Sequence, residues 1–259
     1  MSRIQTAFDH GKAFIPFLTC ADPDLETTEK LVLAMAQAGA DLIELGIPFS
    51  DPVAEGPVIQ QANVRALSGG VTTDRIFELV HRLRQRVEQP MVFMTYANVV
   101  FSYGVERFAQ TAAQAGMDGL ILPDVPLEEK EEFAPAFRQQ GMDFISLAAP
   151  TSRQRVERIA QNAEGFVYCV SSLGVTGVRS RLGQAAGELV EQVRRYTDCP
   201  AAVGFGISTP EQAAEVARYA DGVIVGSAIV ELVARYGREA APYAADYVKT
   251  MKQAIANIQ

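Results

Sequence analysis

The chain has 259 residues, a length typical of one large α/β domain, and 48% of them are apolar, enough for a substantial core. Its 31 acidic residues outnumber the 23 basic ones, which gives a net charge of −8. An acidic surface argues against nucleic-acid binding, because phosphate contacts need basic residues. The sequence has no signal-peptide pattern and no apolar run near the roughly 18 residues of a membrane span, so we expect a cytoplasmic protein.

Cysteine and histidine give little sign of metal or redox chemistry. Cys20, Cys169 and Cys199 have neither the spacing of a metal site nor the number expected of a disulfide framework, so we expect reduced, mostly buried thiols. His10 and His81 lie among polar neighbours on predicted helices. A metal site or a histidine-based triad is therefore poorly supported.

Short apolar runs alternate with amphipathic segments along the chain. We predict strands at 13–19, 41–45, 91–95, 120–122, 144–148, 166–170, 201–203 and 222–225. Between and around them we predict helices at 2–12, 25–38, 58–67, 72–83, 105–115, 128–140, 151–160, 184–196, 227–234 and 242–258, and a further helix that opens at 208–211. Pro135 should kink the helix at 128–140 or delay its start. The strands are almost continuously apolar, as expected for a parallel sheet that is buried on both faces.

Eight such strand–helix units predict a (β/α)8 TIM barrel, with residues 1–259 forming a single domain. The N-terminal helix would cap one end of the barrel, and extra helices would follow the second and eighth strands. A doubly wound open sheet is the alternative. That fold usually carries a glycine-rich nucleotide fingerprint after its first strand, and residues 19–23 are not one. Similar turn signals at 39–41, 116–118, 141–143 and 220–221 precede four strands, and we interpret them as structural punctuation.

Two glutamates stand out near the end of the second strand, where barrels of this kind place their active sites. Alternation along the strand puts Leu42 and Glu44 on one face, with Ile43 and Leu45 on the other. If Ile43 and Leu45 face the helices, Glu44 faces the barrel axis, where desolvation would shift its pKa and suit an acid/base. The alternative is a carboxylate in a stabilising ion pair. Glu55, in the proline-rich loop that follows, is a candidate companion, although a loop acid is usually just solvated.

Glycine-rich turns follow the last two strands and favour a phosphate site. The segment 204–208 follows the seventh strand, and Gly226-Ser227 leads from the eighth strand into a short helix. Backbone N–H groups at such turns and at a helix N-terminus bind phosphate in many barrels. The alternative is that the glycines only permit tight turns. The long loop 171–183 suits a lid, with Thr176 near a catalytic carboxylate and Gly177 near the phosphate, or else a disordered surface loop.

Together these segments resemble the tryptophan synthase alpha subunit family over essentially the whole chain. The resemblance rests on the motifs LIELGIPFSDP (42–52), GPVIQ (56–60), PDVP (123–126), GVTG (174–177), GFGI (204–207) and GSA (226–228). It implies retro-aldol cleavage of indole-3-glycerol phosphate to indole and D-glyceraldehyde 3-phosphate, with no cofactor in this chain. It also implies a partner, a beta subunit that contains pyridoxal phosphate and receives the indole within an alpha2beta2 heterotetramer.

The resemblance also assigns roles to individual residues. Glu44 matches the general acid/base, and Glu55 matches a second carboxylate, usually aspartate, that accepts the indole N–H. The glutamate at 55 is the main departure, and residues 19–23 also differ, because the family often has glycine before Asp-Pro. Residues matching the indole side of the site are Phe17, Met94, Tyr96, Ile121, Leu147, Tyr168 and Thr176. Residues matching the phosphate side are Gly177, Phe205, Gly206, Gly226 and Ser227.

The partner surface and two other functions complete the hypotheses. The loop after the second strand and the segment 98–101 are the candidates for contact with the beta subunit, because they carry apolar residues at the catalytic rim. The first alternative function is a binding subunit that activates its partner with little turnover of its own. The second is a phosphosugar isomerase on the same barrel.

Overall fold

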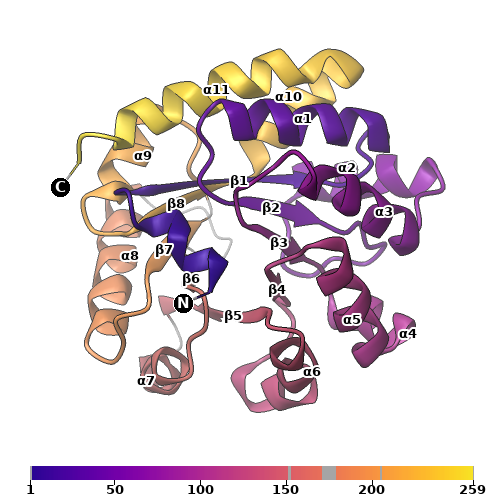
Figure 1. Cartoon of the computed structure of the whole chain (residues 1–259). Coiled ribbons are helices and arrows are strands. Elements are labelled where there is room, and N and C mark those ends of the chain that lie inside the picture. The colour runs from indigo at the N-terminus through magenta and orange to yellow at the C-terminus, as the bar shows by residue number, and fades with distance from the viewer. Residues whose placement is uncertain (1, 151–152, 171–178, 205, 259) are drawn as a thin grey trace.

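The computed structural model describes residues 2–150, 153–170, 179–204 and 206–258. Eight parallel strands close into a barrel in chain order (Figure 1). They are β1 (Ala13–Thr19), β2 (Ile43–Gly46), β3 (Met91–Met94), β4 (Gly119–Ile121), β5 (Asp143–Ala148), β6 (Val167–Val170), β7 (Ala201–Gly204) and β8 (Gly222–Val225). The predicted (β/α)8 barrel is thus confirmed, and the open doubly wound sheet is wrong.

Helices surround the barrel. The α-helices are α1 (Leu25–Gln37), α2 (Pro57–Ser68), α3 (Thr73–Arg84), α4 (Ala97–Tyr103), α5 (Val105–Ala115), α6 (Ala134–Gln139), α7 (Arg153–Gln161), α8 (Arg179–Arg194), α9 (Pro210–Ala217), α10 (Ser227–Tyr236) and α11 (Ala240–Ile255). The described residues also form the short 3-10 helices η1 (Arg3–Phe8), η2 (Leu127–Glu132) and η4 (Gly237–Glu239). The extra helices predicted after the second and eighth strands are α2 and α11. None of these helices is long and apolar enough to span a membrane.

The alternation of β2 divides its side chains as predicted. Leu42 packs in the cluster inside the barrel, whereas Ile43 and Leu45 pack in the cluster between strands and helices. Glu44 pairs in register with Phe17 of β1, a member of the inner cluster. Glu44 therefore faces the barrel interior near the C-terminal end of its strand.

The N-terminal segment closes the opposite end of the barrel. It forms the 3-10 helix η1, which is shorter than the predicted helix at 2–12. Ile4 is fully buried in the inner cluster. It lies so close to the start of β4 that a Cβ on Gly119 would meet its Cδ1 at 2.8 Å. The expected capping role is thus confirmed, with Ile4 as the plug.

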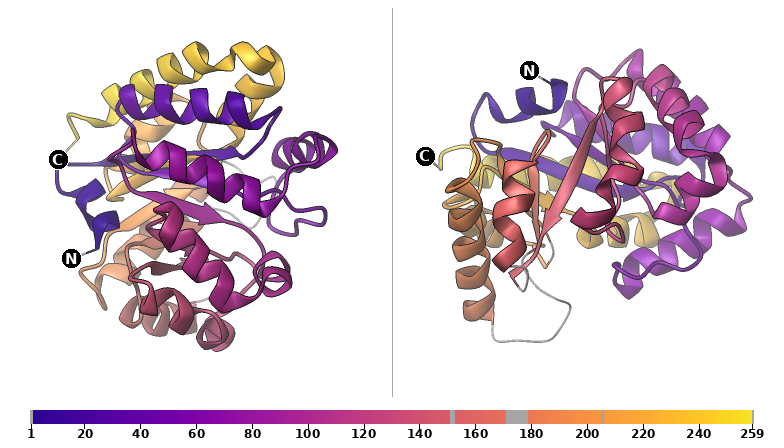
Figure 2. Two further views of the ribbon diagram at one scale, coloured as in Figure 1. Left: turned by 45° about the vertical axis from the view of Figure 1, so that its right-hand side comes forward. Right: turned by 90° about the horizontal axis from the view of Figure 1, so that it is seen from below.

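The last helix completes the ring of helices. α11 packs against both α1 and α9, so the end of the chain lies beside its beginning (Figures 1 and 2). Its Lys252 donates hydrogen bonds to the Lys12 carbonyl, at 2.9 Å, and to Asp41, at 2.6 Å. The ring is therefore tied to the base of the first two strands.

Some segments differ from the prediction. The segment 97–103 forms α4, which the sequence analysis did not foresee, and Val100 within it is fully buried against the core. The prediction that Val100 contacts the partner is therefore wrong. Its neighbour Phe101, by contrast, is 51% exposed. The helix predicted at 128–140 is split into η2 and α6, so its α-helical part does start late, just before Pro135. β2 begins two residues later than predicted, at Ile43, where its register with β3 starts.

Acidic side chains secure the N-terminal ends of the strands. Asp41 Oδ2 accepts from the Phe14 N–H of β1 at 2.7 Å, and Asp118 Oδ2 accepts from the Met91 N–H of β3 at 2.8 Å. Asp221 Oδ2 does the same for the Ala201 N–H of β7 at 2.9 Å. In each case the acid that precedes an even-numbered strand caps the preceding odd-numbered strand. The turn signals noted in the sequence thus have a structural role.

Each of these acids also contacts a basic side chain from a helix. Asp41 pairs with Lys252, Asp118 with Arg84 and Asp221 with Arg194, at N–O distances of 2.6, 2.8 and 2.6 Å. The fifth strand follows the same plan with a different residue. There Glu164 accepts from the Phe144 N–H at 3.1 Å and pairs with Lys130 and Arg138. We call Asp41, Asp118, Glu164 and Asp221 the base carboxylates.

Candidate active site

Glu44 is the most unusual ionisable group of the described structure. Its side chain is 1% exposed, and neither carboxylate oxygen has a hydrogen-bond partner among the described residues. Burial, and secondarily the charge of Glu55, raise the pKa of Glu44 to about 8. The alternative of a stabilising ion pair is therefore wrong, since no basic side chain in the described part of the chain pairs with it. Near neutral pH this carboxyl group can give or take a proton.

Glu55 lies on the loop after β2 and is held by polar neighbours. Asn63 Nδ2 of α2 donates to its Oε2 at 2.7 Å, and the Tyr96 hydroxyl also hydrogen-bonds the carboxylate. Burial raises the pKa of Glu55, while the hydrogen bonds from Asn63 and Tyr96 lower it, and burial prevails. The same Tyr96 oxygen accepts from the Ala54 N–H at 3.1 Å. Glu55 is thus an anchored carboxylate and not a freely solvated loop acid.

A cavity of about 340 Å³ brings the two glutamates together. Most of its lining comes from the C-terminal ends of the strands and the loops that follow them. It contains Phe17, Glu44, Glu55, Met94, Tyr168, Gly206, Gly226 and Ser227, all named from the sequence. The remaining lining residues are Ala54, Gly56, Ile59, Ile207, Ser208, Ile224, Ala228 and Glu231. The lining thus combines the two glutamates and apolar side chains with the glycine turns after β7 and β8, and Glu231 of α10 also belongs to it.

Tyr168 reaches Glu44 from the opposite side of the barrel. Burial, and secondarily the charge of Glu44, raise the pKa of its hydroxyl well above the usual value, so the hydroxyl stays protonated. The ring requires glycine at the end of β7, since a Cβ on Gly204 would lie 2.5 Å from the Tyr168 oxygen. Gly46 at the end of β2 is required in the same way, because a Cβ there would lie 2.7 Å from Phe17 Cζ. The glycines at the rim thus give space to aromatic rings that line the cavity.

The glycine-turn end of the cavity has the features of an anion site. Gly206 has a φ of +75°, a conformation that exposes its backbone and that other residues rarely adopt. Gly226 is the N-cap residue of α10, whose first turn starts at Ser227. The first N–H groups of a helix have no partner within it, and the helix dipole adds partial positive charge there. This end of the cavity can therefore receive a phosphate without a basic side chain.

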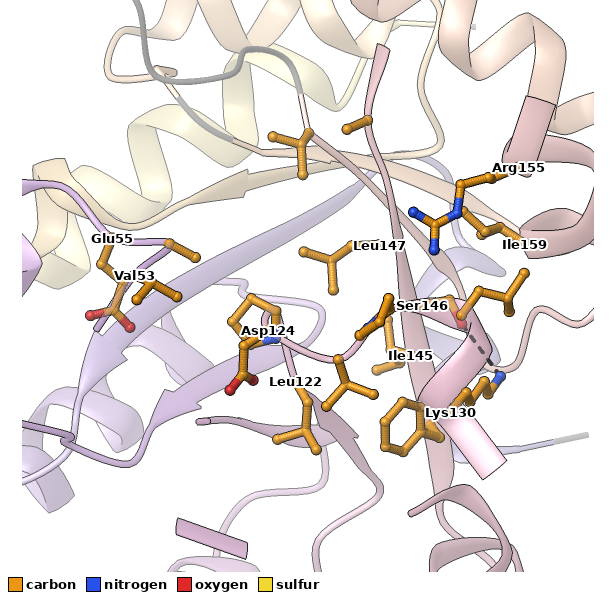
Figure 3. Close-up of a pocket in the computed structure, with 18 of the residues that line it drawn as sticks. Val53, Glu55, Leu122, Asp124, Lys130, Ile145, Ser146, Leu147, Arg155 and Ile159 are labelled. Carbon is orange, nitrogen blue, oxygen red and sulfur yellow. Dashed lines mark hydrogen bonds between the residues drawn. The ribbon is translucent and has the colours of Figure 1, made fainter. Parts of the chain in front are cut away.

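A second, larger cavity of about 870 Å³ adjoins the first. Both are lined by residues 54–56, so the loop that carries Glu55 separates them. Figure 3 shows Val53 and Glu55 at one end of this second cavity and Leu147 in its middle. At the far end, Lys130 donates to Ser146 at 3.3 Å. Lys130 also pairs with Glu164, which explains why a lysine is buried there.

Not every residue suggested for the indole side lies in the same place. Leu147 lines the second cavity, and Ile121 is fully buried in the inner cluster without lining either one. Tyr96 lies behind Glu55 and stacks on Phe49, with ring centroids 5.2 Å apart. Thr176, Gly177 and Phe205 lie outside the described residues. Their suggested roles stay predictions.

The sequence analysis did not single out Ile224 and Ile59, which line the cavity, or Asn63, which contacts Glu55 without lining the cavity. Ile224 could have been found, because alternation along β8 places it on the inner face with Gly222. Ile59 and Asn63 lie in the first two turns of α2, after Glu55, and nothing in the helix pattern marks them as functional. No group of three or more His, Cys, Asp or Glu side chains among the described residues could hold a metal ion.

The fold agrees with comparisons against known proteins. Residues 5–258 match the model of the family described as tryptophan synthase alpha chain. The chain belongs to this family. The family match covers both glutamates and both glycine turns, so the cavity described above lies entirely within the matched region.

Individual relatives support the same assignment. The tryptophan synthase alpha chain of Citrifermentans bemidjiense is 50% identical over 98% of each chain, and that of Lacticaseibacillus casei is 47% identical over 98% of this chain and 96% of its own. The crystal structure of tryptophan synthase subunit alpha from Legionella pneumophila is 38% identical, covers both chains fully and superposes with a TM-score of 0.90. A chain of the tryptophan synthase complex from Pyrococcus furiosus is 35% identical over 94% of this chain and 99% of its own, with a TM-score of 0.85.

Proposed function

We infer that this chain cleaves indole-3-glycerol phosphate to indole and D-glyceraldehyde 3-phosphate, a carbon–carbon lyase reaction of tryptophan biosynthesis. The single observation that carries this proposal is the buried, unpaired Glu44 in a cavity that ends in an anion-binding glycine turn. Family membership supports it, because this cleavage is the reaction of tryptophan synthase alpha chains. The reaction uses no cofactor of this chain.

The chemistry requires one proton to be added and one to be removed. Protonation of the indole carbon C3 moves positive charge to the ring nitrogen. Removal of the proton from the neighbouring side-chain hydroxyl then lets that oxygen form the aldehyde carbonyl as the carbon–carbon bond breaks. The bonding electrons return to the ring and neutralise the nitrogen. A single group with a pKa near neutrality can serve as the acid and then as the base.

Glu44 suits the proton transfers and Glu55 the charge on nitrogen. The pKa of about 8 leaves much of Glu44 protonated at pH 7, as a proton donor must be. Glu55 keeps hydrogen bonds that favour its ionised form, so it can accept the indole N–H. A charge-assisted hydrogen bond of this kind contributes about 1.5–3 kcal/mol, and more to the rate where it strengthens in the transition state.

We assign the phosphate to Gly206, Gly226 and Ser227 and the indole ring to the apolar side chains around Glu44. Phe17, Met94 and Tyr168 line the same cavity as both glutamates, which supports this assignment. We keep Tyr96, Ile121, Leu147 and Thr176 as further indole-side candidates. Gly177 and Phe205 remain candidates for the phosphate side.

The partner is a tryptophan synthase beta subunit, which contains pyridoxal phosphate and receives the indole in an alpha2beta2 complex. The related Pyrococcus furiosus chain is part of such an a2b2 complex. At the catalytic rim, Val53 is 81% exposed and Phe101 is 51% exposed, which suits an apolar contact with another protein. A cytoplasmic location is consistent with this pathway and with three free cysteines.

An assay of indole release tests the proposal. The purified chain is incubated with indole-3-glycerol phosphate, alone and with a beta subunit, and indole is quantified. We expect turnover in both cases and faster turnover with the partner. If no indole forms under either condition, the proposal is contradicted. That result would favour the alternative of a subunit that only binds and activates its partner.

A further inference from the structure

Asn63 is a buried polar side chain on an otherwise apolar helix face. It lies on α2, is 4% exposed, and has the buried Ala62 and Ala66 as its helix neighbours. Its Nδ2 donates to Glu55 Oε2 at 2.7 Å, a short distance for an N–H donor and typical of a charge-assisted hydrogen bond. Burying an amide costs free energy unless it is hydrogen-bonded, so this contact accounts for an asparagine at this position.

The helix that carries Asn63 is fixed against the barrel. Arg65, two residues further along α2, donates from Nε and Nη2 to the two oxygens of Asp22, both at 2.7 Å. Asp22 belongs to the loop after β1 and is 2% exposed. Such a two-point guanidinium–carboxylate contact restricts both the distance and the rotation of the helix. Asn63 is therefore a donor in a fixed position.

The loop around Glu55 is tied to the same helix by its backbone. Gln60 Nε2 donates to the Glu55 carbonyl at 2.9 Å, and the Gln60 N–H donates to the Gly56 carbonyl at 3.0 Å. These contacts fix where the Glu55 side chain starts, but they leave its rotamer free. The Asn63 amide holds Oε2 of the carboxylate at the other end of the side chain, and the Tyr96 hydroxyl also hydrogen-bonds the carboxylate.

We propose that Asn63 is a positioning residue for the cleavage reaction, holding Oε2 of Glu55 so that the other carboxylate oxygen faces the substrate N–H. The proposal rests on the function proposed above for Glu55. Orientation of this kind lowers the barrier without touching the substrate, since it removes the entropy cost of selecting a rotamer in the transition state. The hydrogen bond also favours the ionised carboxylate, the form that answers positive charge on the indole nitrogen.

The length of the glutamate side chain gives a direct test of the geometry. Glu55→Asp withdraws the carboxylate by one methylene, about 1.5 Å, which takes it out of hydrogen-bond range of Asn63 unless the loop moves. The effect of changing Asn63 should therefore largely disappear in the Glu55→Asp background. This non-additivity is the signature of two residues that act through one contact.

The experiment compares Asn63→Leu, which keeps the volume but lacks the donor, with Gln61→Leu, a control at an exposed position of the same helix. With indole-3-glycerol phosphate and the beta subunit present, Asn63→Leu should lower kcat roughly 10- to 100-fold with a smaller change in KM. Carbon-13 NMR of the Glu55 carboxyl should show a higher pKa in Asn63→Leu than in wild type. Gln61→Leu should change neither property.

The outcomes separate the possible failures. An Asn63→Leu protein that is less stable but keeps the wild-type kcat and the wild-type Glu55 titration would overturn the proposal, because Asn63 would then be only structural. Additive effects of Asn63→Leu and Glu55→Asp would overturn it as well. If wild type itself releases no indole, the proposed lyase function fails. The Glu55 titration tests the contact independently of turnover. A higher pKa of Glu55 in Asn63→Leu would support the contact, and an unchanged pKa would refute it.

Discussion

The partly buried base carboxylates at the N-terminal end of the barrel are all paired, whereas the fully buried Glu44 at the C-terminal end is not paired with any described residue. At the N-terminal end, each base carboxylate accepts a backbone N–H of a strand and contacts a lysine or arginine. At the C-terminal end, Glu44 has no partner among the described residues, and its strongest charged neighbour is the like-charged Glu55. The same residue chemistry is thus satisfied in one place and left unsatisfied in the other.

The two ends differ in what burial does to the pKa. Burial raises the pKa of Asp118 above its usual value, while the hydrogen bond from the Met91 N–H and the charges of Arg84 and Arg3 oppose the rise. No hydrogen bond or positive charge from the described residues opposes burial at Glu44, and its pKa rises to about 8. An acid that contributes to stability must be ionised in its pair, whereas an acid/base must change its protonation state during the reaction. The absence of a partner is therefore what makes Glu44 useful.

The largest expected effect is the loss of cleavage in Glu44→Gln. Glutamine keeps the shape but cannot transfer protons, so kcat should fall roughly 100- to 10,000-fold. Indole release measured with the beta subunit checks this, and circular dichroism and inorganic phosphate binding should remain as in wild type. Turnover near the wild-type rate would show that Glu44 is not the acid/base.

Asp118→Ala should produce the opposite result, a loss of stability without a loss of chemistry. It leaves the buried Met91 N–H without its acceptor and removes the charge beside Arg84. We expect the free energy of unfolding to fall by about 3 kcal/mol, measured by urea denaturation. Arg84 keeps hydrogen bonds to the carbonyls of Gly116, Val87 and Gln89, so the damage stays local.

Asp118→Asn is the matched control, because its amide oxygen can still accept the Met91 N–H. Its loss of stability should be smaller than that of Asp118→Ala. For both variants, kcat per folded molecule should match wild type. A large fall in kcat would mean that the N-terminal end of the barrel also takes part in the reaction, contrary to the comparison.

The pH dependence of stability should also distinguish the two ends. A carboxyl group whose pKa is raised by folding, from 4.5 to about 8 for Glu44, stabilises the folded state fully below pH 4.5. That contribution decreases steadily as the pH rises from 4.5 and is fully lost above pH 8. Glu44→Gln has no such loss, so its stability relative to wild type should increase between pH 5 and 8 by about 1.4 kcal/mol per pH unit. Parallel stability curves for the two proteins would contradict the raised pKa.

The catalytic end was largely predictable from the sequence, for local reasons. The alternation within 41–45 was enough to turn Glu44 toward the axis, and the glycines at 204–206 and 226 follow directly from the ends of strands. The position of a residue along a short strand can be read from the local sequence. In a (β/α)8 barrel, the C-terminal ends of the strands form the active site, so this position also locates the residue in the fold.

Partners far apart in the chain were not predictable in this way. Asp41 contacts Lys252, which is 211 residues away, and no periodicity within either segment indicates the other. The partner of Asn63, Glu55, lies in a loop and not on the helix, so no helical periodicity connects the two residues. The prediction that Val100 contacts the partner was wrong for a related reason. An apolar segment at the rim of the barrel can be covered by a neighbouring helix, and α4, which carries Val100, packs against α5.

Glu55→Gln is the smallest of these effects and tests the coupling between the two glutamates. Loss of a charge-assisted hydrogen bond should lower kcat/KM roughly 10- to 150-fold. The charge of Glu55 is the second cause of the raised pKa of Glu44, so neutralising it should lower the pKa of Glu44. Because protonated Glu44 donates the first proton, the fall in rate at alkaline pH should then begin at a lower pH than in wild type. A pH–rate profile of both proteins checks this, and an unmoved alkaline limb would mean that Glu55 acts on the substrate without influencing Glu44.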